Sequence, residues 1–188
     1  MSLWAWKAPL YSSLRSLPPF KNFLEAEKTN LTRLLPLLET APMRHLDIGS
    51  GTGDSLALFH ASEQLVCSDA SGAMLRRLTA PNPKLIAYAE ALPFAEATFD
   101  FVSAIGVLEY VQEEARFFHE AHRVLQPQGY FLFTSAPPVP ANYLRTLWGE
   151  RLYLRNAAEV RAALSVTRWR MVAHARTFLQ EQWLAQRV

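Results

Sequence analysis

Three glycines at alternate positions constrain the fold of this chain more than any other feature. Gly49, Gly51 and Gly53 follow the strand-like run Arg44–Ile48, and residues 54–60 then resume a helical pattern of apolar side chains. Glycine takes positive φ without a steric penalty, so such a run lets the backbone turn sharply and approach a ligand closely. The pattern predicts a strand, a glycine-rich loop and a helix, with a ligand bound on the loop.

Strand-like and helical segments continue to alternate along the chain. We expect strands at residues 44–48, 65–68, 84–88, 99–105 and 130–135, and helices at residues 20–38, 54–60, 71–78 and 113–125. Parallel strands need connections long enough to cross back over the sheet, and these crossovers are right-handed. The alternation therefore predicts a doubly wound α/β fold, with a mainly parallel central sheet and helices on both faces.

The final quarter of the chain departs from this regular alternation. Pro137, Pro138 and Pro140 interrupt the pattern. Beyond them we expect helices from residue 142 and at residues 157–164, a strand at 169–173 and a helix at 179–188.

The composition fits one globular domain. The chain has 188 residues, of which half are apolar and 19% are charged, and this suits a single core of ordinary size. The single cysteine, Cys67, excludes an internal disulfide framework and a multi-cysteine zinc cluster, and we predict no metal site. No apolar run approaches the roughly 20 residues that span a bilayer, and no convincing signal peptide opens the chain. We therefore expect a cytoplasmic protein.

The loop differs from the fingerprint of dinucleotide-binding proteins. That fingerprint is G-x-G-x-x-G, and Asp54 stands where its third glycine would be. Asp47, just before the loop, disfavours a phosphate and favours the ammonium of an amino-acid-like ligand. Both observations indicate an adenosine cofactor other than a nicotinamide dinucleotide.

Five motifs follow one another in order from residue 45 to residue 130. They are His45–Gly53, Asp69 with its neighbours up to Leu75, Ala89–Phe94 before Phe99, Ile105–Val111 and His122–Tyr130. In this order and spacing they resemble the class I S-adenosylmethionine-dependent methyltransferases, in particular the small-molecule branch with short, single-domain chains. The resemblance covers about residues 44–135. It implies a Rossmann-like fold and S-adenosylmethionine as the cofactor.

The resemblance also implies a set of cofactor-binding residues. The loop would hold the methionine end of the cofactor, Asp69 would accept both ribose hydroxyls, and small or apolar residues would lie beside the adenine. The implied set is Asp47, Gly49, Ser50, Gly51, Asp69, Ala70, Met74, Ala89, Glu90 and Ile105. A carboxylate accepts two hydroxyl donors well, which gives Asp69 a physical rationale of its own. The family usually has an aspartate where this chain has Tyr88, so adenine selection would rest on the main chain at Ala89.

Methyl transfer of this kind requires no obligatory catalytic side chain. The cofactor supplies an activated methyl group, and orientation with desolvation can contribute roughly 7 to 11 kcal/mol. A base would help a hydroxyl or amine acceptor. The side chains placed to act as one are Glu109, Tyr110, Tyr11 and Tyr143.

The two ends of the chain indicate the acceptor. Residues 45–144 hold five basic and eleven acidic side chains, whereas residues 145–188 hold eight arginines against three glutamates. We divide the single domain into a leading segment (1–40), a cofactor-binding core (41–135) and an acceptor-side segment (136–188). Residues 1–17 carry an apolar stripe beside Lys7 and Arg15. We favour a lid there, with peripheral contact to a membrane surface as the alternative.

These features predict a methyltransferase that acts on a small-molecule or lipid-like acceptor. No asparagine-proline-proline-aromatic run follows the fourth strand and no separate RNA-binding module fits into the chain, so we expect no nucleic acid partner. Two alternatives remain open. One is a catalytically silent S-adenosylmethionine-binding protein or methyltransferase partner, and the other, which Asp54 disfavours, is a nicotinamide-dependent oxidoreductase.

Overall fold

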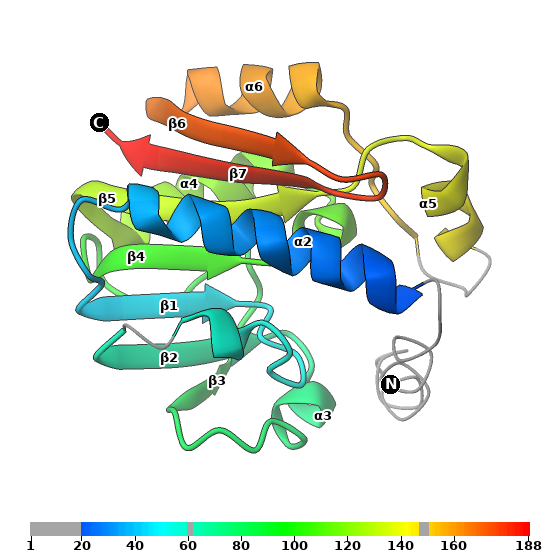
Figure 1. The fold of residues 1–188 in the computed structure, drawn as a ribbon. Helices are drawn as coiled ribbons and strands as arrows, with labels where there is room; N and C mark the ends of the chain where they lie inside the picture. Colours follow the sequence, from blue (N-terminus) through cyan, green and yellow to red (C-terminus); the bar gives the residue numbers. More distant parts are fainter. Residues whose placement is uncertain (1–19, 60–61, 147–150) are drawn as a thin grey trace.

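The computed structural model describes residues 20–59, 62–146 and 151–188 (Figure 1). The helices are α2 (Phe20–Leu34), α3 (Gly72–Leu75), α4 (Glu114–Val124), α5 (Pro140–Thr146) and α6 (Ala157–Val166). Three short 3₁₀ turns are η1 (Leu35–Leu37), η2 (Leu56–Leu58) and η3 (Leu108–Tyr110). The strands are β1 (Arg44–Ile48), β2 (Gln64–Asp69), β3 (Lys84–Ile86), β4 (Phe99–Ala104), β5 (Leu125–Ser135), β6 (Trp169–Arg176) and β7 (Glu181–Arg187).

The seven strands form one twisted sheet in the order β3-β2-β1-β4-β5-β7-β6. Strands β1 to β5 run parallel to one another, whereas β7 runs antiparallel between β5 and β6. The chain order reverses at β1, which lies between β2 and β4. The predicted doubly wound α/β fold is confirmed, and the carboxyl ends of the parallel strands meet at one edge, where such folds bind their ligands.

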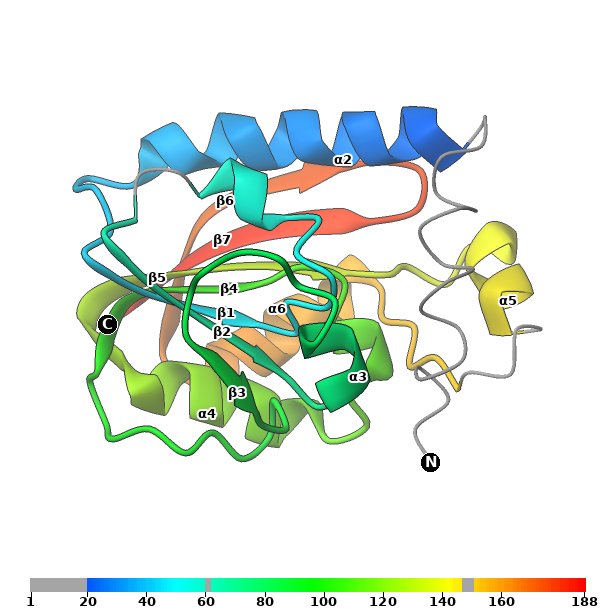
Figure 2. The ribbon, with the colours of Figure 1, turned by 90° about the horizontal axis from the view of Figure 1, so that it is seen from below.

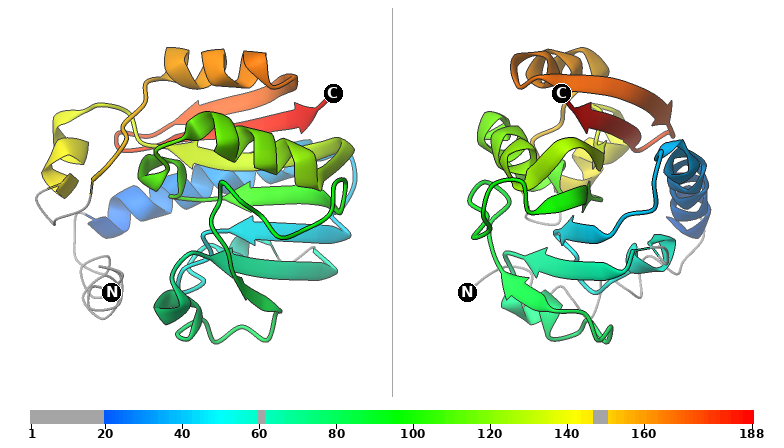
Figure 3. Two further views of the ribbon diagram at one scale, coloured as in Figure 1. Left: turned by 180° about the vertical axis from the view of Figure 1, so that it is seen from behind. Right: turned by 90° about the vertical axis from the view of Figure 1, so that its left-hand side faces the viewer.

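Helix α2 covers one face of the sheet (Figure 1; Figure 3, right). Its Leu31 and Leu34 are buried against Phe101, Leu132 and Leu184, which come from three different strands. Successive side chains of a strand point to opposite faces, so these strand residues form one side of the core.

Helices α4 and α6 cover the opposite face (Figure 3). Phe117 and Phe118 of α4 pack on Phe131 and Phe133 of β5, with ring centroids between 5.3 and 6.4 Å apart. The two core layers therefore hold the sheet between them, and its carboxyl edge is left to the loops.

The helix predicted at residues 54–60 is wrong. Over residues 54–59, which the structure describes, the chain forms turns and the short 3₁₀ helix η2 in place of an α-helix, and β2 begins at Gln64. The short stretch between Gly53 and β2 leaves little length for a crossover helix with its two connections. Helix α2 lies over the same side of the molecule as η2 (Figure 2) and packs against the apolar residues of this turn.

The helix predicted at residues 179–188 is also wrong, because the segment forms strand β7. Trp183 and Leu184 are both fully buried, one in each core layer. A strand that lies between two others and is covered on both faces is apolar at adjacent positions, which hides the alternation that identifies a half-exposed strand.

Other elements differ from expectation only in their bounds. Strand β3 ends at Ile86, and β5 begins at Leu125. Helix α3 is a single turn in which Ser71 is the N-cap, accepting a hydrogen bond from the amide of Met74. None of the helices in the described ranges combines the length and the apolar character needed to cross a bilayer.

Candidate cofactor and acceptor site

The glycine loop lies at the carboxyl end of β1. Gly49, Gly51 and Gly53 have φ values of +68°, +54° and +91°, a region that other residues rarely adopt. A Cβ atom at Gly49 would lie 2.4 Å from Cγ2 of Val107, whereas one at Gly51 would make ordinary contacts with the methyl group of Met74, at 3.4 Å, and the carbonyl oxygen of Gly49, at 3.9 Å. The loop thus needs its glycines for their positive φ values, and at Gly51 no neighbouring atom crowds the backbone.

Asp69 joins the loop to the end of β2. Its carboxylate accepts hydrogen bonds from the amide of Gly51 at 2.9 Å and from the amide of Ser71 at 2.7 Å. Burial raises the pKa of this carboxyl, and the two amide bonds oppose the rise. Each carboxylate oxygen has two lone pairs, so Asp69 keeps acceptor capacity for hydroxyl groups.

Asp47 lies beneath the loop with 1% of its surface exposed. Burial raises the pKa of its carboxyl to about 6, and a hydrogen bond from the hydroxyl of Ser103 opposes the rise. Its Oδ2 atom is buried and has no hydrogen-bond partner within the part of the chain that the structure describes. A buried carboxylate oxygen without a partner is an acceptor for a donor that the chain does not supply.

The residues predicted to flank the adenine come from the end of β2, α3, the turn after β3 and the end of β4. Met74 and Ala89 are buried, Glu90 and Ile105 are half-buried, and Ala70 is exposed. The amide of Ala87 donates to the carbonyl of Asp69 at 3.2 Å, which fixes the turn beside that carboxylate. Tyr88 is 68% exposed.

These residues fit the cofactor that the sequence resemblance implies. The uncrowded backbone at Gly51 and the spare acceptor capacity of Asp69 match an amino-acid end and two ribose hydroxyls. Oδ2 of Asp47, which no described residue bonds, matches an ammonium group. Asp47 and the loop would hold the amino-acid end, and Asp69 would hold the ribose.

A polar cluster lies at the same edge, beyond the ends of β4 and β5. Glu109 is 1% exposed, and its Oε1 accepts from Nη2 of Arg145 at 3.0 Å, while its Oε2 is buried without a partner among the described residues. The same Nη2 lies 3.3 Å from the hydroxyl of Tyr110. Asn142 orients Arg145 and donates to the carbonyl of Leu179 in the β6–β7 turn. The cluster thus joins α5 to two loops.

The four side chains proposed as bases from the sequence are distributed unevenly. Glu109 and Tyr110 lie together in the polar cluster. Tyr143 is 55% exposed on α5. Tyr11 and the predicted lid or membrane segment 1–17 lie outside the described residues.

Several structural partners of the site went unnoticed in the sequence. Arg155 is 8% exposed and donates to the carbonyls of Leu108 and Val111, at 2.8 and 2.7 Å, so it fixes the loop that carries Glu109. Gln180 is buried near Gly106, and its Oε1 has no hydrogen-bond partner among the residues that the structure describes. Both come from the C-terminal quarter, and no motif or spacing links them to the strand ends that they approach.

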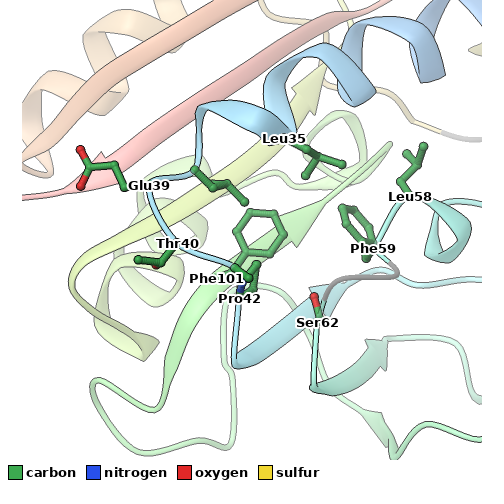
Figure 4. A pocket seen from close by; sticks show the side chains of 10 residues that line it. Leu35, Glu39, Thr40, Pro42, Leu58, Phe59, Ser62 and Phe101 are labelled. Carbon is green, nitrogen blue, oxygen red and sulfur yellow. The ribbon is translucent and has the colours of Figure 1, made fainter.

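Two surface cavities lie away from this edge. One of about 180 Å³ is lined by apolar side chains including Leu35, Phe59 and Phe101, with Ser62 at its side (Figure 4). A second, of about 210 Å³, lies between Pro42 and residues 126–130. Within the described ranges no three His, Cys, Asp or Glu side chains are arranged to hold a metal ion.

Known proteins similar to this chain include methyltransferases. Residues 46–133 match the family model described as a methyltransferase domain. A malonyl-[acyl-carrier protein] O-methyltransferase from Legionella pneumophila is 33% identical over 129 residues, which are 64% of this chain and 45% of the relative. One from Geobacter sulfurreducens is 30% identical over 162 residues, which are 80% of this chain and 56% of the relative.

A solved structure matches nearly the whole chain. An S-adenosylmethionine-dependent methyltransferase from Thermotoga maritima gives a TM-score of 0.77 at 14% identity, covering 99% of this chain and 98% of the other. The chain spans about half the length of the curated relatives that it matches. Residues 46–133 thus match a methyltransferase domain like that of the class I S-adenosylmethionine-dependent methyltransferases, and the solved structure shows that the chain shares their fold.

Proposed function

We propose that this chain transfers a methyl group from S-adenosylmethionine to a small-molecule or lipid-like acceptor, as one methyltransferase domain. The observation that carries the proposal is the pairing of the glycine loop with Asp69, whose carboxylate accepts from the amide of Gly51 at 2.9 Å. This bond places the backbone that would hold an amino-acid end next to the carboxylate that would hold a ribose.

In such an enzyme the protein mainly positions the two reactants. The cofactor, when bound, supplies an activated methyl group for an in-line displacement. Glu109 and Arg145 would define the acceptor side, because they lie beyond the strand ends and are tied to each other at 3.0 Å. The buried Oε2 of Glu109 offers an acceptor for a donor group on the incoming molecule.

The finer proposal is O-methylation of a carboxylate on a carrier-linked acyl chain. It comes from the names of the relatives, which methylate malonyl groups on an acyl-carrier protein. Exposed apolar side chains, Tyr143, Leu144 and Phe178, lie on α5 and the β6–β7 turn and could contact an acyl chain. Several basic side chains of the C-terminal segment suit an anionic partner.

The test is a transfer assay with S-adenosylmethionine labelled in its methyl group. We expect label in malonyl-[acyl-carrier protein] and none in the unloaded carrier. Label that appears only in a bacterial lipid extract would support the methyltransferase activity and show that the acceptor is a lipid and not malonyl-[acyl-carrier protein]. Binding of the cofactor without transfer to either would favour the silent binding protein.

One departure from the family pattern, at Tyr88, supports the alternative of a catalytically silent S-adenosylmethionine-binding protein. Tyr88 stands where an aspartate is usual and is 68% exposed, so no side-chain acceptor for the adenine amine is provided there. The nicotinamide alternative is tested by thermal unfolding. Stabilisation by a nicotinamide dinucleotide, with none by S-adenosylhomocysteine, would overturn the proposed function.

A further inference from the structure

A chain of buried hydrogen bonds leads from the surface cavity beside η2 to the carboxylate beneath the glycine loop. Ser62 Oγ lies 3.1 Å from Nδ1 of His45, and Nε2 of His45 lies 2.8 Å from Oγ of Ser103. Ser103 in turn donates to Oδ1 of Asp47. The register of the sheet explains this contact, because Asp47 and Ser103 lie directly opposite each other on β1 and β4.

The arrangement of donors fixes the state of the imidazole. Ser103 has one hydroxyl hydrogen, and when it donates this to Asp47 it can accept only from a protonated Nε2 of His45. Nδ1 then carries no hydrogen and accepts from Ser62. Burial against Phe59 and Phe101, with ring centroids 4.7 and 4.5 Å away, keeps the ring neutral and lowers the pKa of His45 to about 3.

We propose that His45 and Ser103 are positioning residues for cofactor binding: they hold Oδ1 of Asp47, so that Oδ2 remains the acceptor for the ammonium at the amino-acid end. This inference rests on the proposed function and deepens it. Both side chains would act on the cofactor through Asp47: Ser103 bonds its carboxylate directly, and His45 bonds Ser103.

Other groups around Asp47 also affect the pKa and the hydrogen bonds of its carboxyl. The carboxylate of Asp69, on β2, raises the pKa of Asp47, and the buried thiol of Cys67 lies on the same strand. Ser50 and Ser68 donate to the backbone carbonyl of Asp47, at 2.9 and 3.2 Å, and no described residue bonds its Oδ2. Ser103 donates to Oδ1, and both Ser103 and the nearby Ser50 hydroxyl lower the pKa of Asp47, so removal of Ser103 should raise this pKa further.

The matched variants are Ser103→Ala and Ser68→Ala. Both remove a buried hydroxyl from a strand next to Asp47, but only Ser103 bonds its carboxylate. The probes are S-adenosylhomocysteine and 5′-methylthioadenosine, which lacks the amino-acid end. By calorimetry we expect Ser103→Ala to weaken S-adenosylhomocysteine binding about tenfold, consistent with loss of one charge-assisted hydrogen bond. Its affinity for methylthioadenosine should stay within twofold, and Ser68→Ala should change neither.

The pH profile separates positioning from a merely structural role. Affinity for S-adenosylhomocysteine should fall as the pH drops through the pKa of Asp47, and the midpoint should lie higher in Ser103→Ala than in the natural chain. Ser103→Thr should restore both affinity and midpoint, which guards against a folding defect in the alanine variant.

His45 is tested in the same way. His45→Phe should reproduce the effect of Ser103→Ala, and His45→Gln, which keeps a donor near Nε2, should restore much of the affinity. Equal S-adenosylhomocysteine affinity and midpoint in the natural chain and in Ser103→Ala would overturn this inference alone. Failure of the natural chain to bind either nucleoside would overturn the proposed function as well.

Discussion

At the scale of single residues, Asp69 is the side chain on which the cofactor site depends most. In Asp69→Ala we expect roughly a 10- to 100-fold loss of affinity for S-adenosylhomocysteine, because a hydrogen bond to a charged group contributes about 1.5 to 3 kcal/mol. The measurement is calorimetric titration, with circular dichroism to verify the fold.

Asp100→Asn is the matched control. Asp100 also accepts from two backbone amides, those of Met43 and Arg44, but at the opposite edge of the sheet. The Asp100→Asn variant should be less stable than the natural chain but bind S-adenosylhomocysteine with the same affinity. Equal losses of affinity in the two variants would mean that Asp69 acts on the fold and not on the ligand.

Two glycines at positive φ allow a second test of the loop. Gly49→Ala should be destabilised more than Gly106→Ala, by about 1 to 3 kcal/mol, the usual range for overpacking. Both residues have similar φ values, +68° and +69°, but the new Cβ would meet Val107 at 2.4 Å in the first and nothing nearer than 3.9 Å in the second. Urea unfolding measures the difference. Equal losses would exclude the predicted contact with Val107.

The sequence located the residues that lie close to the loop along the chain, but not their partners across the sheet. Asp47, Asp69 and the glycines stand where a strand turns into a loop, and that position can be read from the pattern of apolar residues. His45 and Ser103 are 58 residues apart, and they meet because β1 and β4 pair in one particular register. Register depends on the packing of the whole sheet, which a single sequence pattern does not specify.

At the scale of elements, the C-terminal segments hold the acceptor-side loop in place. Arg155, just before α6, donates to the carbonyls of Leu108 and Val111 and pairs with Glu114. Arg155→Ala removes the donor to the carbonyl of Val111, one of two donors to the carbonyl of Leu108 and the partner of Glu114, so we expect a loss of about 3 kcal/mol in the free energy of unfolding. Chemical denaturation measures it.

Arg151→Ala is the control for this element. Arg151 is exposed, and its guanidinium lies 5.3 Å from the centre of the Tyr153 ring. A contact of that kind contributes about 0.5 to 1 kcal/mol at an exposed site. A loss in Arg155→Ala no larger than in Arg151→Ala would contradict the role given to Arg155.

The elements that the sequence predicted well are those with a clear period or cap. The strand at residues 44–48, the helix α4 and the Ser71 cap have such signals. Strand β7 has none, because burial on both faces makes its side chains apolar or internally hydrogen-bonded at every position. The helix predicted at residues 54–60 was wrong for another reason. The apolar spacing there fits a helix, but the stretch before β2 is too short for a helix with its connections.

At the scale of the whole molecule, one buried and two half-buried histidines make stability depend on pH. The pKa values of His45, His122 and His174 are all lowered, chiefly by burial. The unfolded chain therefore binds more protons below about pH 6.5, and each histidine lowers stability as the pH falls. Asp47 has the opposite effect. Its pKa is raised to about 6 in the folded chain, so the folded chain takes up this proton at a higher pH than the unfolded chain and gains stability as the pH falls.

His45 and Asp47 should nearly cancel between about pH 6 and pH 4. In that window the folded chain holds a proton on Asp47 and the unfolded chain holds one on His45, so their joint contribution to the slope is close to zero. His45→Phe removes the histidine's contribution and leaves that of Asp47. Its stability relative to the natural chain should rise as the pH falls, with a slope of about 1.4 kcal/mol per pH unit at most. Parallel pH profiles of the two proteins, measured by urea unfolding, would refute the assignment.

The account as a whole rests on one nucleoside bridging the loop after β1 and the carboxylate at the end of β2. A crystal structure with S-adenosylhomocysteine tests this most directly. We predict its ribose hydroxyls on Asp69 and its amino-acid end over Gly49 to Gly51, within reach of Oδ2 of Asp47. Density for the nucleoside at any other place, with the glycine loop and Asp69 unchanged and free of ligand, would contradict it.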